Sequence, residues 1–275
     1  MKKVLLVAVV SLGLLAGSVS SVNATSDWGN AIPIPALIGL NTGGNADSNS
    51  VSCASAGNCA VTGYYNDEDG SQGFVVNQTN GTWGNAIPIP ALSDLNTGGD
   101  AQGNSVSCAS AGNCAVTGSY EDSAGTQGFV VNQTSGTWGS AISIPALSGL
   151  NTSGDAEGTS VSCASAGNCA VTGYYDNGEG GYQGFVVNQT SGTWGSAISI
   201  PALIGLNTGG SAEGSSVSCA SAGNCAVTGF YNNGAGPAGG IGVVPARPAG
   251  DQGFVVNLTS VVPPTDPAVV LKFTG

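Results

Sequence analysis

Apolar and small polar residues alternate with a period of two in short runs that recur along the chain. The runs NSVSC, CAVTGYY and GFVVNQT each place one set of side chains on one face, as half-buried β-strands do. The run TWGNAIPIP alternates isoleucine with proline, which suits an outer edge strand because proline cannot donate to a β-ladder. No segment shows a convincing period of 3.6 residues. The pattern therefore predicts an all-β chain with little helix.

These four runs form a unit that occurs four times. Equivalent tryptophans are separated by 55, 55 and 56 residues, and so are equivalent cysteines. Four short strands in a repeat of this length indicate the blade of a β-propeller. The chain begins with a lone fourth strand, DWGNAIPIP, and the last copy lacks one. We therefore expect a four-bladed β-propeller over residues 25–260, closed by the N-terminal strand. An open or domain-swapped repeat array is the alternative.

The order SVSC, GNCAVTG and GFVVNQTNGTW resembles the Asp-box, or BNR-type, propeller repeat. It is also similar to photosystem assembly-factor-like propellers and to secreted bacterial proteins with SVSC…C-x-V-G units. The resemblance covers nearly all of residues 26–260 and implies a propeller fold. The Asp-box aspartate is missing, because Thr79-Asn80-Gly81 stands in its place in the first copy. Sialidase chemistry needs an arginine cluster, and Arg247 is the only arginine, so the resemblance implies fold and not function.

Each unit carries two cysteines in the unchanged stretch SCASAGNCAVTG. One cysteine ends the first strand and the other begins the second, so the pair faces across a hairpin turn at a spacing that a disulfide can bridge. Zinc binding is less favoured because histidine is absent, and redox chemistry is less favoured because there is no C-x-x-C pair. The expected disulfides are Cys53–Cys59, Cys108–Cys114, Cys163–Cys169 and Cys219–Cys225.

Residues 1–24 have the pattern of a secretory signal peptide, with Lys2 and Lys3 before a short apolar run and Val22-Asn23-Ala24 at its end. We expect a secreted protein, extracellular or periplasmic, with no membrane span and with a C-terminal tail at residues 261–275. Loss of the signal leaves two basic residues against sixteen acidic ones, a net charge of −14. Such a chain would repel phosphate backbones, which excludes nucleic-acid binding.

The four copies differ mainly at one end of the predicted blades. The turn between the first two strands reads ASAGN in every copy, whereas the loop between the second and third strands varies in sequence and length. Fourteen of the sixteen acidic residues fall in these variable loops or in the connections between repeats. The fourth variable loop spans residues 232–251. The candidate binding residues in the variable loops are Asp67, Glu68, Asp69, Glu121, Asp122, Asp176, Glu179 and Arg247.

This acidic face supports three hypotheses. The first is a non-catalytic secreted scaffold that binds a protein, a glycan or a cation, with calcium at Asp67 and Asp69 as one possible ligand. The second is a carboxylate-dependent, glycosidase-like hydrolase, which would need two acids from different blades at a suitable separation. The third is a structural protein of the cell envelope. No catalytic residue is assigned, and no cofactor other than calcium is expected.

Overall fold

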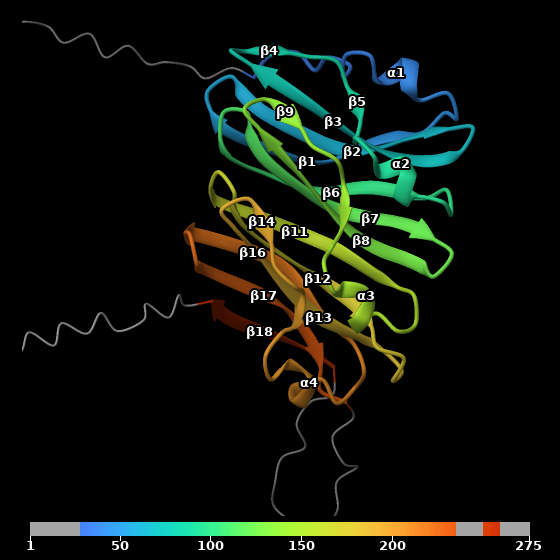
Figure 1. The fold of residues 1–275 in the computed structure, drawn as a ribbon, viewed down its shortest axis with the longest axis vertical. Coiled ribbons are helices and arrows are strands. Elements are labelled where there is room, and N and C mark those ends of the chain that lie inside the picture. The colour runs from blue at the N-terminus through green and yellow to red at the C-terminus, as the bar shows by residue number, and fades with distance from the viewer. Residues whose placement is uncertain (1–27, 235–249, 259–275) are drawn as a thin grey trace, which may run out of the picture. The chain divides into compact units, whose positions relative to one another are not determined.

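The computed structural model describes residues 28–234 and 250–258, which form repeated antiparallel sheets (Figure 1). The chain divides into two units, Met1–Ile32 and Pro33–Gly275, and every strand belongs to the second. The predicted signal peptide, the residues after 258 and Arg247 lie outside the described residues. The all-β prediction is confirmed, because only four one-turn helices interrupt the strands of the described part.

Each sheet takes three long strands from one repeat. The first contains β1 (Ala46–Ser55), β2 (Asn58–Asp67), β3 (Gly70–Thr79), β4 (Thr82–Trp83) and β5 (Ile87–Pro88). The second contains β6 (Ala101–Ser110), β7 (Asn113–Asp122), β8 (Gly125–Thr134), β9 (Thr137–Trp138) and β10 (Ile142–Ser143). The third contains β11 (Ala156–Ser165), β12 (Asn168–Asp176), β13 (Tyr182–Thr190), β14 (Thr193–Trp194) and β15 (Ile198–Ser199). The fourth contains β16 (Ala212–Ser221), β17 (Asn224–Asn232) and β18 (Asp251–Leu258).

The predicted fourth strand is present, but it is divided into two short pieces. In the first sheet both pieces, β4 and β5, pair with β3, so Pro88 lies on the outer edge where the alternation with isoleucine places it. The break follows Trp83, where the N–H of Gly84 donates to the carbonyl of Asn77 at 2.8 Å. A single helical turn follows β5, β10 and β15: α2 (Leu92–Leu95), α3 (Leu147–Leu150) and α4 (Leu203–Leu206), respectively. An equivalent turn, α1 (Leu37–Leu40), precedes β1.

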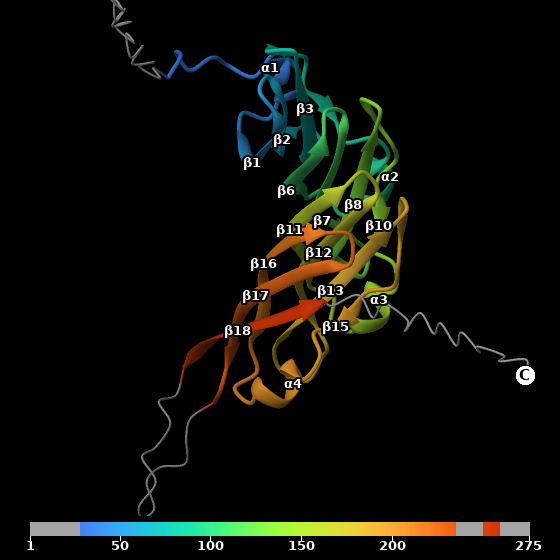
Figure 2. The ribbon, with the colours of Figure 1, turned by 90° about the vertical axis from the view of Figure 1, so that its left-hand side faces the viewer.

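The hydrophobic core consists of layers between successive sheets. Between the first and second sheets, one layer contains Val75, Val106 and Phe129 together with Leu92 of α2 and Trp138 of β9. The same arrangement recurs one repeat further on, with Val130, Phe185 and Trp194. In Figures 1 and 2 the sheets accordingly follow one another in sequence order, with the first and the fourth at the two ends.

Ring closure by the N-terminal strand is not confirmed. The fourth sheet contains only β16, β17 and β18 among the described residues, and residues 28–34 form no strand. Ile34 and Leu37 instead pack against the outer face of the first sheet, beside Phe74 and Val76. The structure is therefore an all-β array of repeated antiparallel sheets whose two end sheets are not joined.

Candidate functional site

The constant end of the array consists of the four disulfide-linked hairpins. Cys53 and Cys59 are register partners across the first hairpin, and each of the other three pairs repeats this arrangement. All four predicted disulfides are present, with Cα atoms 3.9–4.0 Å apart. The cysteines are therefore structural, and among the described residues no cysteine is free for metal or redox chemistry.

The opposite, variable end carries the acidic residues. Several lie at strand ends rather than in loops: Asp67, Asp122 and Asp176 are the last residues of β2, β7 and β12. Each of these three side chains accepts a hydrogen bond from the backbone N–H two residues ahead, at 2.7–2.9 Å. In the fourth repeat Asn232 accepts the same bond from Gly234. One aspartate in each of the first three loops therefore stabilises its turn, and the sequence pattern did not indicate this role.

A buried asparagine joins neighbouring sheets at this end. The Nδ2 of Asn96 donates to the carbonyl of Ser71 in the first sheet, and its Oδ1 accepts from the N–H of Glu121 in the second. Asn151 and Asn207 follow α3 and α4 in the same way and also donate to the preceding sheet. The motif LNT recurs unchanged at the end of each helical turn. This repetition in the sequence could have indicated that the asparagine has the same structural role in every copy.

A pocket of about 600 Å³ opens at the variable end of the first sheet, where β2 and β3 meet α2 and the connection that follows it. Asp67 and Asp69 line it, and Tyr65, Ile89 and Leu92 supply an apolar wall. Gly98 also lines this pocket, and its N–H donates to the carbonyl of Glu121 at 2.8 Å, so Glu121 lies beside the pocket. The structure thus brings Asp67 and Asp69 to one concave surface, with Glu121 next to them.

The other predicted acids are not gathered at this pocket. Glu68 and Asp122 do not line it, and Asp176 and Glu179 belong to the loop of the third sheet, where Glu179 accepts a hydrogen bond from Asn177. No group of three or more aspartate, glutamate, histidine or cysteine residues lies close enough to hold a metal ion in the described ranges. Calcium binding at Asp67 and Asp69 stays a prediction.

A second acidic cluster, which the sequence did not single out, lies at the third sheet. Tyr182 donates a hydrogen bond to Asp155, which raises the pKa of Tyr182 to about 12. The rings of Tyr174 and Tyr182 meet edge to face with centroids 4.8 Å apart. Burial raises the pKa of Glu157, although hydrogen bonds from Tyr174 and Asn104 oppose the shift. Tyr182 occurs only in the third repeat, whose loop is one residue longer than those of the first two repeats. This difference in the sequence could have indicated the cluster.

The recurring tyrosines at the ends of the second strands serve the core. Tyr65, Tyr120, Tyr175 and Tyr231 are all buried. The hydroxyl groups of Tyr120 and Tyr175 are hydrogen-bonded to Ser143 and Ser199. Their role is packing rather than presentation of a flat aromatic surface.

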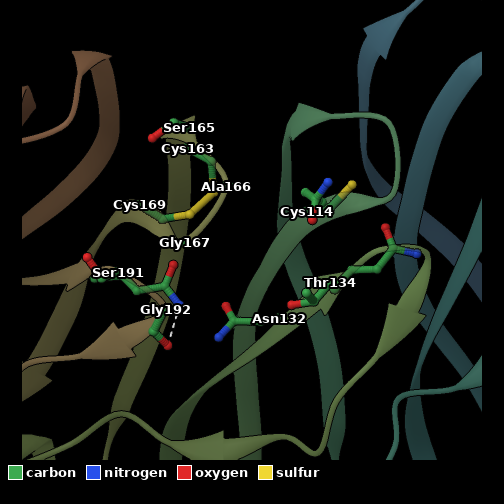
Figure 3. A pocket seen from close by; sticks show the side chains of 13 residues that line it. Cys114, Asn132, Thr134, Cys163, Ser165, Ala166, Gly167, Cys169, Ser191 and Gly192 are labelled. Atoms are coloured by element: carbon green, nitrogen blue, oxygen red, sulfur yellow. Dashed lines mark hydrogen bonds between the residues drawn. A yellow bond between two sulfur atoms is a disulfide. The ribbon is translucent and has the colours of Figure 1, made fainter.

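The constant end also has two equivalent pockets, of about 250 and 240 Å³. Figure 3 shows the larger one, between the hairpin that carries Cys163–Cys169 and the strand that carries Asn132. The Oδ1 atoms of Asn77 and Asn132 are buried in these pockets without a protein hydrogen-bond partner. The lining is polar and uncharged, so these pockets contrast with the acidic one.

The electrostatic character of the variable end follows from composition. All four basic residues of the chain, at positions 2, 3, 247 and 272, lie outside the described residues. The acids in the described part therefore have no lysine or arginine there to pair with. Within that part of the chain, no helix has both the length and the apolar character needed to cross a membrane.

The fold and site define a disulfide-stapled all-β repeat protein with one acidic end. No protein-family model matches the chain, so membership of the Asp-box family is not confirmed. No curated protein matches either. A solved structure with similarity is a subtype N11 neuraminidase-like protein of A/flat-faced bat/Peru/033/2010 (H18N11), at 17% identity and a TM-score of 0.38. The match covers 67% of this chain and 47% of that one, and a likeness this distant transfers no residue role.

Proposed function

We propose that this protein is a non-catalytic, exported scaffold that binds a cationic partner through the pocket at its acidic end. The observation that carries the proposal is the pairing of Asp67 and Asp69 with the apolar wall of Tyr65, Ile89 and Leu92 in one pocket. An ammonium or guanidinium group on an apolar stem matches this chemistry, because the stem is covered while the charge meets the carboxylates.

The surrounding charge supports the same conclusion. The described residues contain acids and no basic side chain, so within that part of the chain nothing cancels the negative potential. A field of one sign speeds the encounter with a partner of opposite sign and weakens with salt. The half-buried carboxylate of Asp67 and the exposed one of Asp69 together contribute on the order of 1 kcal/mol to such a contact, which corresponds to about a fivefold to tenfold change in affinity.

Export is part of the proposal. The four disulfides are bonds that persist in oxidising compartments, and they fit the predicted signal peptide at residues 1–24. A rigid array of stapled sheets with variable loops at one end is a common way to present a binding surface. The hydrolase and cell-envelope hypotheses stay predictions.

The test is a titration of a fluorescent oligoarginine peptide, followed by anisotropy, with the full exported chain and its D67N/D69N variant. An asparagine at position 67 preserves the turn, because Asn232 accepts the equivalent hydrogen bond in the fourth repeat. We expect the variant to bind about fivefold to tenfold more weakly at low salt. The matched control D176N, in the third repeat, should bind like the parent. Equal binding by D67N/D69N and the parent would refute the proposal.

A further inference from the structure

Successive sheets meet through one repeated set of contacts. At the first junction the N–H groups of Val106 and Cys108 donate to the hydroxyls of Ser50 and Ser52, at 3.1 and 3.0 Å. The second and third junctions repeat both bonds at 3.0–3.2 Å, with the donors Val161 and Cys163, then Val217 and Cys219. We call the face of a sheet that lies toward the preceding sheet its front, and the opposite face its back. The front of one sheet therefore contacts the back of the preceding sheet in the same way at three junctions.

The two end sheets present the unused halves of this interface. Val51, which is equivalent to Val106, is 62% exposed, whereas Val106 is 5% exposed. On the fourth sheet Val255 is 79% exposed, whereas the equivalent Val75 is fully buried. Ser216 and Ser218 stand on β16 where Ser50 and Ser52 stand on β1. The back of the fourth sheet thus carries the groups that the front of the first sheet would meet.

The fourth sheet also lacks its tryptophan. Trp138 and Trp194 are buried beside the preceding sheet, and Trp138 packs with Cys114, Val116 and Val131. At the equivalent place an apolar pocket of about 90 Å³ is lined by Cys225, Val227 and Val256. Trp28, the equivalent tryptophan at the start of the chain, is fully exposed.

A backbone bond fixes the segment that carries each tryptophan. The N–H of Ala141 donates to the carbonyl of Pro90 of the preceding connection, and Ala197 donates to Pro145 in the same way, both at 2.8 Å. Pro201 lines the apolar pocket of the fourth sheet. The carbonyl of Pro201 is equivalent to those of Pro90 and Pro145. It could therefore accept the corresponding hydrogen bond from the N–H of Ala31, which lies three residues after Trp28.

We propose that the back of the fourth sheet binds the front of the first sheet of a second copy of this chain. In this head-to-tail contact, residues 28–33 of the second copy add the missing strand to β18, and Trp28 fills the apolar pocket. A second copy is the occupant because the chain's own first sheet carries the matching sequence, and because Val51 on its front and Val255 on the back of the fourth sheet are both exposed in a single chain. Such a contact is heterologous, so it produces a closed ring of copies or an open chain of them.

One residue limits the affinity of this contact. At the internal junctions a threonine of one sheet lies against a glycine of the next, and a Cβ at Gly103 would lie 2.0 Å from the Oγ1 of Thr62. In the first sheet Ser48 occupies the position of that glycine, and in the fourth sheet Thr228 is exposed. The contact between copies must therefore open slightly at this point, so it is weaker than an internal junction.

Sedimentation velocity of the full exported chain over a wide concentration range tests the proposal. We expect concentration-dependent association that V51D, V255D or W28A each weakens by at least about tenfold, since each removes or charges a buried contact. S48G should strengthen association, because it restores the glycine of the internal junctions. The control I38D changes an exposed residue whose equivalents Ser93, Ser148 and Ile204 are exposed at the internal junctions, and it should have no effect.

Mixing V51D with V255D separates the proposal from misfolding. Each variant keeps one intact face, so the mixture should form a 1:1 complex that grows no further, at concentrations where each variant alone does not associate. A parent chain that stays monomeric at every concentration would overturn the proposal. So would a monomer in which hydrogen exchange shows Val255 protected, because that result would mean closure within one chain.

Discussion

Replacement of Gly158 by alanine tests how closely the sheets approach one another. A Cβ at this position would lie 2.0 Å from the Oγ1 of Thr117 in the preceding sheet, which is well inside van der Waals contact. Thr117 is fully buried, and its hydroxyl donates to the carbonyl of Phe129 at 2.8 Å. The added methyl group can be accommodated only if Thr117 loses this bond or the two sheets move apart.

Either response destabilises the fold by a similar amount. Loss of the buried hydrogen bond costs about 1–3 kcal/mol, and overpacking costs about as much. The smaller conformational freedom of alanine in the unfolded chain offsets about 0.4–1 kcal/mol. We therefore expect G158A to lower the free energy of unfolding by about 2 kcal/mol, which corresponds to about 4–8 °C in Tm for a chain of this size.

Urea unfolding with the disulfides intact measures this change. The matched control is S48A, at the equivalent position of the first sheet, where no preceding sheet lies close and the change should stay within about 0.5 kcal/mol. In a double-mutant cycle, T117A should relieve part of the cost of G158A, with a coupling energy of about 1 kcal/mol or more. If G158A were as stable as the parent, the conclusion that the second and third sheets pack closely at this glycine would be refuted.

Three further predictions concern stability. C163A/C169A should lower the free energy of unfolding by about 2 kcal/mol in urea melts, because the disulfide closes a short loop; an unchanged midpoint would contradict this. The raised pKa of Glu157 means that the folded state holds this proton more tightly, so stability falls as pH rises above the ordinary value of 4.5. E157Q introduces the glutamine that the second repeat has at the equivalent position, Gln102. This variant should therefore be more stable than the parent at neutral pH and lose this advantage in acid. Equal melting curves at neutral pH would argue against this prediction. N151A should cost about 1–3 kcal/mol in urea melts, because its side chain loses three hydrogen bonds, two donated to Thr126 and Gln127 and one accepted from Asp155. An unchanged midpoint would mean that this asparagine is not needed to join the sheets.

The sequence predicted the features that depend on neighbouring residues. The alternation of apolar and polar positions identified the three long strands of each sheet, and the spacing of Cys53 and Cys59 identified the hairpin disulfide. The helical turns were missed because four residues are too few to show a helical period. Each turn also begins after an alanine in the left-handed region, such as Ala91 with φ of 59°, which no residue preference predicts.

Features that depend on distant segments were predicted less well. The role of Asn96 requires two sheets to be placed side by side, and the turn-stabilising role of Asp67 looked like surface charge in the sequence. Ring closure depends on the angle between successive sheets, and strand patterns do not encode that angle. Of the candidate acidic residues in the variable loops, only Asp67 and Asp69 line the pocket.

The most direct test of the proposed function is amide chemical-shift mapping of the oligoarginine peptide on the isotope-labelled chain. The proposal predicts that shift changes cluster around Tyr65, Asp67, Asp69 and Leu92, and that they fade as salt is added. The contradicting result is a set of changes centred on Asn132 and Ser191 in the uncharged pocket of the constant end, or no changes at either end.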